Sequence, residues 1–222
     1  MVQITANIAT RPQRFKELKQ MLKSIKGQFD EVRIYLNECD EVPEWLHSYT
    51  VVTGENLTDN GKFYFLQFVK DEIYCSLDDD IIYPRNYADN LRKGIEKHNT
   101  IVTHHGRILV AKDVSYYGGH RFFHCANNQP EECLIDVAGT GVTAFDTRYF
   151  RPNIWDSEYK CMSDIVFSLE AINQNKKITV LPHAVGWIKP LLVETSIYSQ
   201  HRHKESVQIS LANKIFEKKS NN

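Results

Sequence analysis

The stretch IYCSLDDDIIYP, residues 73–84, decides how the rest of the chain is interpreted. Its apolar, β-rich first half predicts a strand that runs directly into Asp78, Asp79 and Asp80. Alternation along an extended chain would place Asp78 and Asp80 on one side and Asp79 on the other. Two carboxylates on one face suit a hard divalent cation, Mg²⁺ or Mn²⁺. A solvated acidic turn is the alternative, but the strand-like, apolar flanks favour a metal site.

Upstream of this stretch, short β-rich runs alternate with segments whose apolar residues recur at three- and four-residue spacing. Strands are predicted at 2–9, 32–36, 49–53 and 73–77, and helices at 12–27, 63–69 and 87–95, followed by a strand from residue 101. This order predicts an α/β fold with a mostly parallel central sheet flanked by helices. In open sheets of this kind, ligands bind beyond the carboxyl ends of the strands.

Beyond about residue 105 the order of elements is less regular. Residues 104–128 are rich in Gly, His and Tyr, which predicts hairpins or loops. The strand pattern of 134–145 is interrupted by Gly139-Thr140-Gly141, where glycine allows a bulge or the close approach of a ligand. Helices at 164–173 and 207–216, a strand at 178–181 and a frayed tail at 218–222 complete the prediction.

Composition narrows the class of protein. The chain has 222 residues, of which 42% are hydrophobic and 25% charged, so one ordinary globular domain is expected. The formal net charge of -1 argues against general nucleic-acid binding but permits a local basic pocket. No membrane-spanning run or secretory signal is predicted. The five cysteines form no CxxC pair, which is typical of reduced thiols in a cytoplasmic protein.

Two further clusters are weaker signals. Histidines and cysteines in the second half suggest zinc, but their spacing matches no standard zinc pattern, so a zinc site is not predicted. These residues are His104, His105, His120, His124, Cys125 and Cys133. The basic run 201–204 is interpreted as a solvated face, with a diphosphate or an anionic membrane surface as alternatives.

Taken in order, these segments resemble the GT-A fold glycosyltransferases, in particular the large inverting bacterial family that includes cellulose and capsule synthases. The triplet at 78–80 resembles the DXD motif of that family. The further matching segments are Ile4 to Arg14, Asp30 to Asn37, Asn60 to Phe63, Val137 to Phe145 and Met162 to Ile165, so the resemblance covers roughly residues 1–190. It implies a GT-A-like, Rossmann-type fold in a single domain, 1–222. Residues 1–105 would bind the nucleotide sugar and 106–200 the acceptor, with 201–222 forming a C-terminal helix and tail.

The resemblance also assigns roles to residues. Metal ligands would be Asp80, Asp78 and His183, although a hydrogen-bonded loop histidine is an equal alternative for the last. The nucleotide sugar would be bound by Thr10, Arg11, Arg14, Asn37, Lys62, Asp78, Asp79, Gly139, Thr140 and Gly141. For Arg14 and Lys62, an exposed surface position is the alternative. Trp187 would stack on the acceptor sugar or fill the core.

Asp164 is the candidate catalytic base. It precedes an apolar-periodic helix, so it could equally serve as an N-cap. As a base it would remove the proton from the acceptor hydroxyl. Asp156 and Glu158 are the nearest rivals. The family's acidic pair before the base helix is here Ser163-Asp164, which leaves a single candidate.

The function that these features imply is sugar transfer. A metal-dependent, inverting hexosyltransferase would move a sugar from a nucleotide diphosphate sugar, UDP-linked, to a hydroxyl of a glycan or lipid-linked acceptor. The resemblance implies bacterial surface polysaccharide or lipopolysaccharide synthesis, in the cytoplasm or at the inner face of the membrane. A sugar nucleotidyltransferase is the alternative enzyme, although 9–12 lacks the glycine that such enzymes carry after the first strand. The alternative that is not an enzyme is a non-catalytic sugar-binding protein on the same fold.

Overall fold

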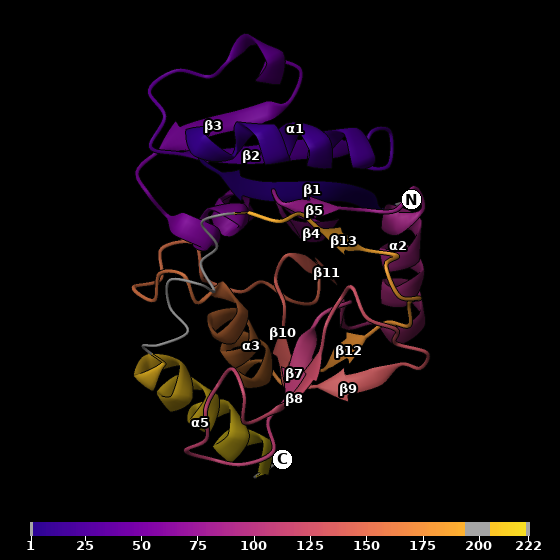
Figure 1. Ribbon diagram of the computed structural model, residues 1–222, viewed down its shortest axis with the longest axis vertical. Coiled ribbons are helices and arrows are strands. Elements are labelled where there is room, and N and C mark those ends of the chain that lie inside the picture. Colours follow the sequence, from indigo (N-terminus) through magenta and orange to yellow (C-terminus); the bar gives the residue numbers. More distant parts are fainter. Residues whose placement is uncertain (1, 194–204, 221–222) are drawn as a thin grey trace.

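An eight-stranded sheet runs through the molecule in the computed structural model, which describes residues 2–193 and 205–220 (Figure 1). The strand order is β3-β2-β1-β4-β11-β6-β12-β9. The bounds are β1 Gln3–Thr10, β2 Glu31–Asn37, β3 Thr50–Gly54, β4 Glu72–Asp78, β6 Ile101–Thr103, β9 Cys133–Ile135, β11 Val142–Asp146 and β12 Ile178–Val180. Two small sheets accompany it, one of β10 (Val137–Ala138), β7 (Gly106–Ile108) and β8 (Arg121–Phe123), the other of β13 (Lys189–Pro190) and β5 (Ile81–Ile82).

The first half of the large sheet is fully parallel. β3, β2, β1 and β4 run in one direction, and β6 pairs with β12 in parallel as well. β11 lies between β4 and β6 and runs antiparallel to both, while β9 is an antiparallel edge strand. The predicted mostly parallel α/β sheet is therefore confirmed. Because β1, β2 and β4 are parallel neighbours, their carboxyl ends meet at one edge of the sheet.

In the described residues, four α-helices and three 3-10 segments accompany the strands. They are η1 Pro12–Arg14, α1 Phe15–Ser24, η2 Glu44–Leu46, η3 Thr58–Gln67, α2 Tyr87–His98, α3 Ser163–Asn173 and α5 Ser206–Ser220. The helix predicted at 63–69 is instead the 3-10 segment η3, which begins five residues earlier and ends two residues earlier. The tail predicted to fray from residue 218 continues as helix to Ser220.

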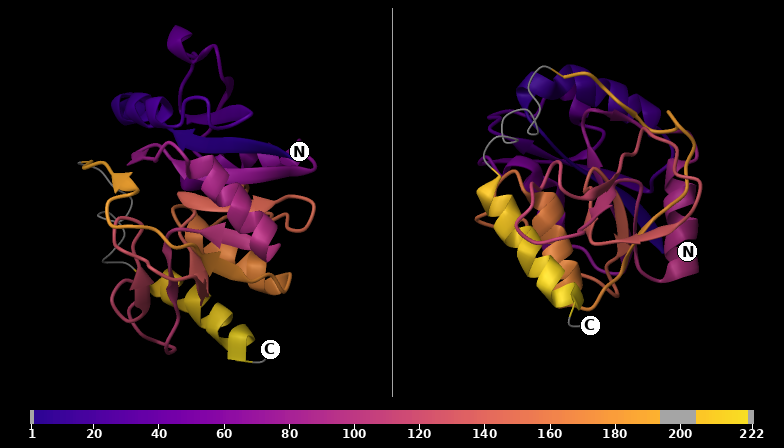
Figure 2. Two further views of the ribbon diagram at one scale, coloured as in Figure 1. Left: turned by 90° about the vertical axis from the view of Figure 1, so that its right-hand side faces the viewer. Right: turned by 60° about the horizontal axis from the view of Figure 1, so that its bottom comes forward.

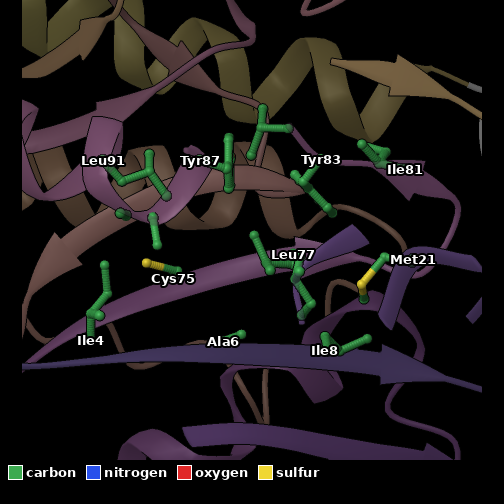
Figure 3. Close-up of a cluster of buried hydrophobic side chains, with 14 of the residues drawn as sticks. Ile4, Ala6, Ile8, Met21, Cys75, Leu77, Ile81, Tyr83, Tyr87 and Leu91 are labelled. Atoms are coloured by element: carbon green, nitrogen blue, oxygen red, sulfur yellow. The ribbon is translucent and has the colours of Figure 1, made fainter. Parts of the chain in front are cut away.

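Side chains of successive strand residues pack into two separate cores, one on each face of the sheet. On β4, Ile73, Cys75 and Leu77 join a core that includes the buried faces of α1 and α2. Figure 3 shows this core, with Ile4, Ala6 and Ile8 of β1 beneath Tyr87 and Leu91 of α2. Tyr74 points to the opposite core.

That opposite core is rich in aromatic rings. Phe63, Tyr74, Phe145 and Phe167 stack in a continuous group between η3, the sheet and α3. α5 packs against α3, and the two helices lie side by side in Figure 2. Helices therefore cover both faces, as predicted, and the sheet edge where β1, β2 and β4 end is left for a pocket.

Three further observations concern the sequence predictions. All five cysteines are free thiols. Among the helices that the structure describes, none has the length and apolar character needed to cross a bilayer. The basic run 201–204 lies outside the described residues.

Candidate functional site

A pocket of about 850 Å³ opens at the carboxyl ends of the parallel strands. Thr10, Asn37 and Asp78 are the last residues of β1, β2 and β4, and all three line it. The structure also brings to this pocket the predicted residues Arg11, Arg14, Lys62, Asp79, Asp80, Gly139, Thr140, Gly141 and Asp164. Residues far apart in the sequence thus converge where the parallel sheet predicts a ligand site.

The acidic triplet does not follow the predicted alternation. β4 ends at Asp78, and Asp79 and Asp80 form a turn. One guanidinium nitrogen of Arg14 therefore reaches both, at 3.1 Å from Asp79 and 2.5 Å from Asp80. Asp79 is buried and also accepts a hydrogen bond from the Thr10 hydroxyl at 2.6 Å. The predicted alternation required an extended chain through Asp80, but the strand ends at Asp78.

Lys62 is the second cation of the site. Its side chain is almost fully buried, and its ammonium donates to a carboxylate oxygen of Asp78. The charges of Asp78, Asp59 and Asp164 raise the pKa of Lys62 despite its burial. Lys62 is therefore a charged, buried part of the pocket, and the alternative of a surface lysine is excluded.

Negative charge still exceeds positive charge around the triplet. Burial, followed by the charges of Asp78 and Asp79, raises the pKa of Asp80 to about 6. Burial also raises the pKa of Asp79 despite its contact with Arg14. Arg14 contacts only one carboxylate oxygen of Asp80, Oδ2. Asp78 and Asp80 thus offer hard oxygen ligands in surroundings that a divalent cation would stabilise, so these residues fit Mg²⁺ or Mn²⁺.

Two glycines allow the loop between β10 and β11 to lie against the site. A Cβ at position 141 would stand 2.0 Å from a carboxylate oxygen of Asp78, and one at position 139 would stand 2.4 Å from the His105 ring. Neither glycine has a positive φ. They are needed for the close approach of these side chains, rather than for backbone conformation.

Asp164 lies in the first turn of α3 and lines the pocket. Its Oδ1 accepts hydrogen bonds from the Thr140 backbone N–H at 2.7 Å and from the Thr140 hydroxyl at 2.6 Å. It does not cap its own helix, because Met162 is the N-cap residue. Burial raises the pKa of Asp164, which makes its carboxylate a stronger base than a solvated one.

Asp59 is a residue of the site that the sequence did not reveal. Its Oδ2 accepts hydrogen bonds from the backbone N–H and hydroxyl of Ser163, at 3.0 and 2.5 Å. Asp59 therefore caps α3 from another segment of the chain and fixes the turn that carries Asp164. Because its partner is 104 residues away, no local capping pattern signals this role.

Asn37 is also held by protein groups. Its amide nitrogen donates to the carbonyl oxygens of Thr10 and Thr58, and its amide oxygen accepts from the Leu57 backbone N–H. This side chain therefore ties the end of β1 to the segment before Lys62. Its expected contact with a nucleotide stays a prediction.

His183 and Trp187 lie behind the pocket wall. Neither is among the residues that line the pocket. His183 is buried, its Nδ1 lies 2.9 Å from the Leu181 carbonyl oxygen, and its ring packs against His104. Trp187 is half-buried against Tyr87 and His104. In this structure Trp187 packs against the core, which was the alternative to stacking on an acceptor sugar. Among the described residues, the ligand atoms of His183, Asp78 and Asp80 do not form a group within 4.8 Å of one another.

Three residues of the rejected zinc pattern do meet. Ligand atoms of His105, His124 and Cys125 lie within 4.8 Å of one another on the pocket wall. However, Nδ1 of His105 accepts from the Cys125 backbone N–H at 3.4 Å, and Nδ1 of His124 accepts from that of Ala126 at 3.1 Å. In each neutral ring the proton then sits on Nε2, so metal binding would cost both hydrogen bonds.

Comparison with known proteins identifies a similar fold. No protein-family model matches the chain, and no curated protein matches it. Among solved structures, it is similar to a crystal structure of S. aureus TarS, residues 1–349, in complex with UDP-GlcNAc, with a TM-score of 0.59 and 13% sequence identity. The similarity covers 89% of this chain and 61% of that one. The chain therefore has a GT-A-like α/β fold.

Proposed function

We propose that the protein is a glycosyltransferase that moves a sugar from a nucleotide diphosphate sugar to an acceptor hydroxyl. The observation that carries this proposal is the convergence of Asp78–Asp80, Arg14, Lys62 and Asp164 on one pocket. That pocket lies at the carboxyl ends of β1, β2 and β4, in a fold similar to one that holds UDP-GlcNAc. The finer terms of the proposal are a UDP-linked donor, a bound divalent metal and inversion at the anomeric carbon.

In this mechanism, Asp80 and Asp78 would hold Mn²⁺ or Mg²⁺. When bound, the metal supplies Lewis-acid stabilisation of the negative charge that develops on the departing diphosphate. Arg14 and Lys62 orient the carboxylates through their ion pairs and place two positive charges beside the same region. Thr10 and Arg11, at the end of β1, line the pocket where the nucleotide would lie.

Asp164 acts as the general base. It accepts the proton of the acceptor hydroxyl while that oxygen attacks the anomeric carbon, and the bond from this carbon to the diphosphate oxygen breaks. The nucleoside diphosphate leaves with the electron pair of that bond. One displacement without a covalent intermediate inverts the anomeric centre. Thr140 fixes the base through two hydrogen bonds to one of its oxygens, Oδ1.

The acceptor and pathway follow from the family resemblance alone. We propose a glycan or lipid-linked acceptor, in bacterial surface polysaccharide or lipopolysaccharide synthesis, with the protein acting in the cytoplasm or at the inner membrane face.

The test is thermal unfolding with UDP, GDP and CMP, each with and without Mn²⁺. A ligand that binds only the folded protein raises its melting temperature. We expect a Mn²⁺-dependent rise that is largest with UDP, and its loss in Asp80→Asn. A control variant, Asp136→Asn, alters a carboxylate whose ion pair with Lys219 lies outside the pocket, so it should respond as the wild type does. A folded sample that responds to none of the nucleotides would overturn the proposal and favour a non-catalytic protein.

A further inference from the structure

Arg107 is a buried cation on the pocket wall that the proposed mechanism does not use. It lies on β7, opposite Phe122 of β8. Its guanidinium carbon is 4.0 Å from the centre of the Tyr116 ring, 5.0 Å from that of Phe122 and 5.9 Å from that of Tyr117. One guanidinium nitrogen donates to the Tyr116 carbonyl oxygen at 2.5 Å. Three aromatic rings therefore surround one positive charge.

Among the residues that the structure describes, Arg107 has no carboxylate partner, unlike the other buried Arg and Lys side chains. Arg33 and Lys62 are the other buried Arg and Lys side chains in the part of the chain that the structure describes, and both form ion pairs with carboxylates. No described carboxylate lies within 4.0 Å of Arg107. A desolvated guanidinium without an anion is costly, and the planar donors of arginine match carboxylate and phosphate groups.

The position of Arg107 relates it to the acceptor. Arg107, Tyr116, Tyr117 and Phe122 line the same pocket as Asp164. Burial raises the pKa of Tyr116 and Tyr117, and the charge of Asp164 adds to both shifts, so both rings lie within electrostatic reach of the candidate base. Thr10 and Asn37, where the nucleotide is expected, belong to other elements, at the ends of β1 and β2. Because a general base must contact the acceptor hydroxyl, a group bound at Arg107, in electrostatic reach of Asp164, would belong to the acceptor.

We propose that Arg107, with Tyr116, Tyr117 and Phe122, forms a subsite for the anionic group of the acceptor, which is a sugar that carries a phosphate or a carboxylate. This inference rests on the proposed glycosyl transfer. The anion pairs with the guanidinium, the rings cover the apolar face of the acceptor, and a hydroxyl reaches Asp164. The subsite selects the acceptor and positions it, while the donor is bound elsewhere in the pocket.

The probes are glucose, glucose 6-phosphate and glucuronate, titrated calorimetrically into the protein with saturating UDP and Mn²⁺. The nucleotide blocks the diphosphate region, so the probes report on the rest of the pocket. We expect one or both anionic sugars to bind about 10-fold or more tightly than glucose. Preference for glucose 6-phosphate indicates a phosphate-bearing acceptor, and preference for glucuronate indicates a carboxylate-bearing one.

The variants identify the residue responsible. Arg107→Gln should abolish the preference for the anionic sugar, and Arg107→Lys should retain part of it because the positive charge remains. Arg121→Gln is the matched control, since Arg121 lies on β8, stacks on Phe123 at 5.0 Å and does not line the pocket. If Arg121→Gln lost the preference for the anionic sugar to the same extent, the preference would come from general surface charge and the assignment would be overturned.

If Arg107→Gln does not fold, the relative affinities of the wild-type protein for the three sugars still test the proposal. Equal affinity for glucose and for both anionic sugars overturns it. Failure of the glycosyltransferase proposal is distinguishable, because UDP would then not bind in the same samples. In that case anion binding that depends on Arg107 would still show a binding site, but not an acceptor site.

Discussion

Two charged clusters lie at opposite ends of the same three strands, and their electrostatics differ. At the amino ends, Arg33 of β2 binds Glu72 of β4 at 2.8 Å and Glu31 at 2.6 Å, and the Thr5 hydroxyl of β1 donates to Glu72. We call Thr5, Glu31, Arg33 and Glu72 the amino-end cluster. The carboxyl-end cluster consists of Arg14, Lys62, Asp78, Asp79 and Asp80.

The amino-end cluster is satisfied by the protein itself. Hydrogen bonding to Arg33 lowers the pKa of Glu31. In the carboxyl-end cluster, burial and mutual repulsion instead raise the pKa of Asp80. Each cluster holds one carboxylate more than it has cations. At the amino ends one guanidinium bonds both carboxylates, whereas at the carboxyl ends Asp80 stays partly buried beside two like charges, which disfavours its charged form. The difference distinguishes a structural network from a binding site on a single sheet.

The largest expected effect concerns Asp164, the candidate base beside the carboxyl-end cluster. Asp164→Asn should lower the rate of sugar transfer by about 10²–10⁴-fold, because the variant cannot accept the hydroxyl proton. Donor binding, measured by calorimetry, should change little. Glu158→Gln is the control, since Glu158 is exposed and was a rival candidate. Full transfer activity in Asp164→Asn would refute the base assignment.

The second prediction breaks the amino-end cluster. Arg33→Met leaves Glu72 buried without its cation, so the free energy of unfolding should fall by about 3–5 kcal/mol. Urea unfolding measures this loss. Nucleotide affinity of the folded fraction should be unchanged, because the change lies at the far end of the strands. A loss of nucleotide affinity with normal stability would contradict the division between the two clusters.

The third prediction uses the raised pKa of Asp80. The pKa of Asp80 is about 6 in the folded protein, and its ordinary value in the unfolded chain is 3.8. The protonated carboxyl therefore stabilises the fold fully below pH 3.8, and this stabilisation is lost as the pH rises through about 6. Without metal, Asp80→Asn should therefore gain about 1–3 kcal/mol relative to the wild type between pH 4 and pH 7. Urea unfolding in a chelator at both pH values tests this, and an equal difference at the two values counts against it.

The smallest effect has the opposite pH dependence. The lowered pKa of Glu31 stabilises the fold above its ordinary value of 4.5, and this stabilisation is lost as the pH falls. Because Glu31 is partly exposed, Glu31→Gln should cost less than about 1 kcal/mol at pH 7. Unfolding at pH 3 should show almost no difference from the wild type. A cost that persists at pH 3 would mean that packing, and not charge, holds Glu31.

Much of the structure of residues 1–105 was predictable because its signals are local. Apolar periodicity located β1, α1, β2 and β4, and parallel topology then placed Thr10, Asn37 and Asp78 at one edge. The alternation argument was wrong for Asp79 and Asp80, because a turn replaces the strand there. No propensity marks the residue at which a strand stops when polar residues follow it.

The second half depends on contacts that the sequence does not signal. The hairpin of β7 and β8 was predicted only as an unplaced region, yet it brings Arg107 and Phe122 to the pocket. His183 and Trp187 follow a strand, as pocket residues often do, but β12 lies beyond β6 in the sheet and directs them elsewhere. Their placement is set by long-range strand order, which spacing along the chain does not determine.

The contact between Gly141 and Asp78 has a consequence for how related sequences can vary. The carboxylate of Asp78 occupies the space that any side chain at position 141 would need. A chain that gains even a methyl group there must move or replace the acid, and a chain that loses the acid no longer requires the glycine. In related sequences, the residues at positions 78 and 141 should therefore change together. A sequence in which only Gly141 is replaced should have lost the function of this pocket.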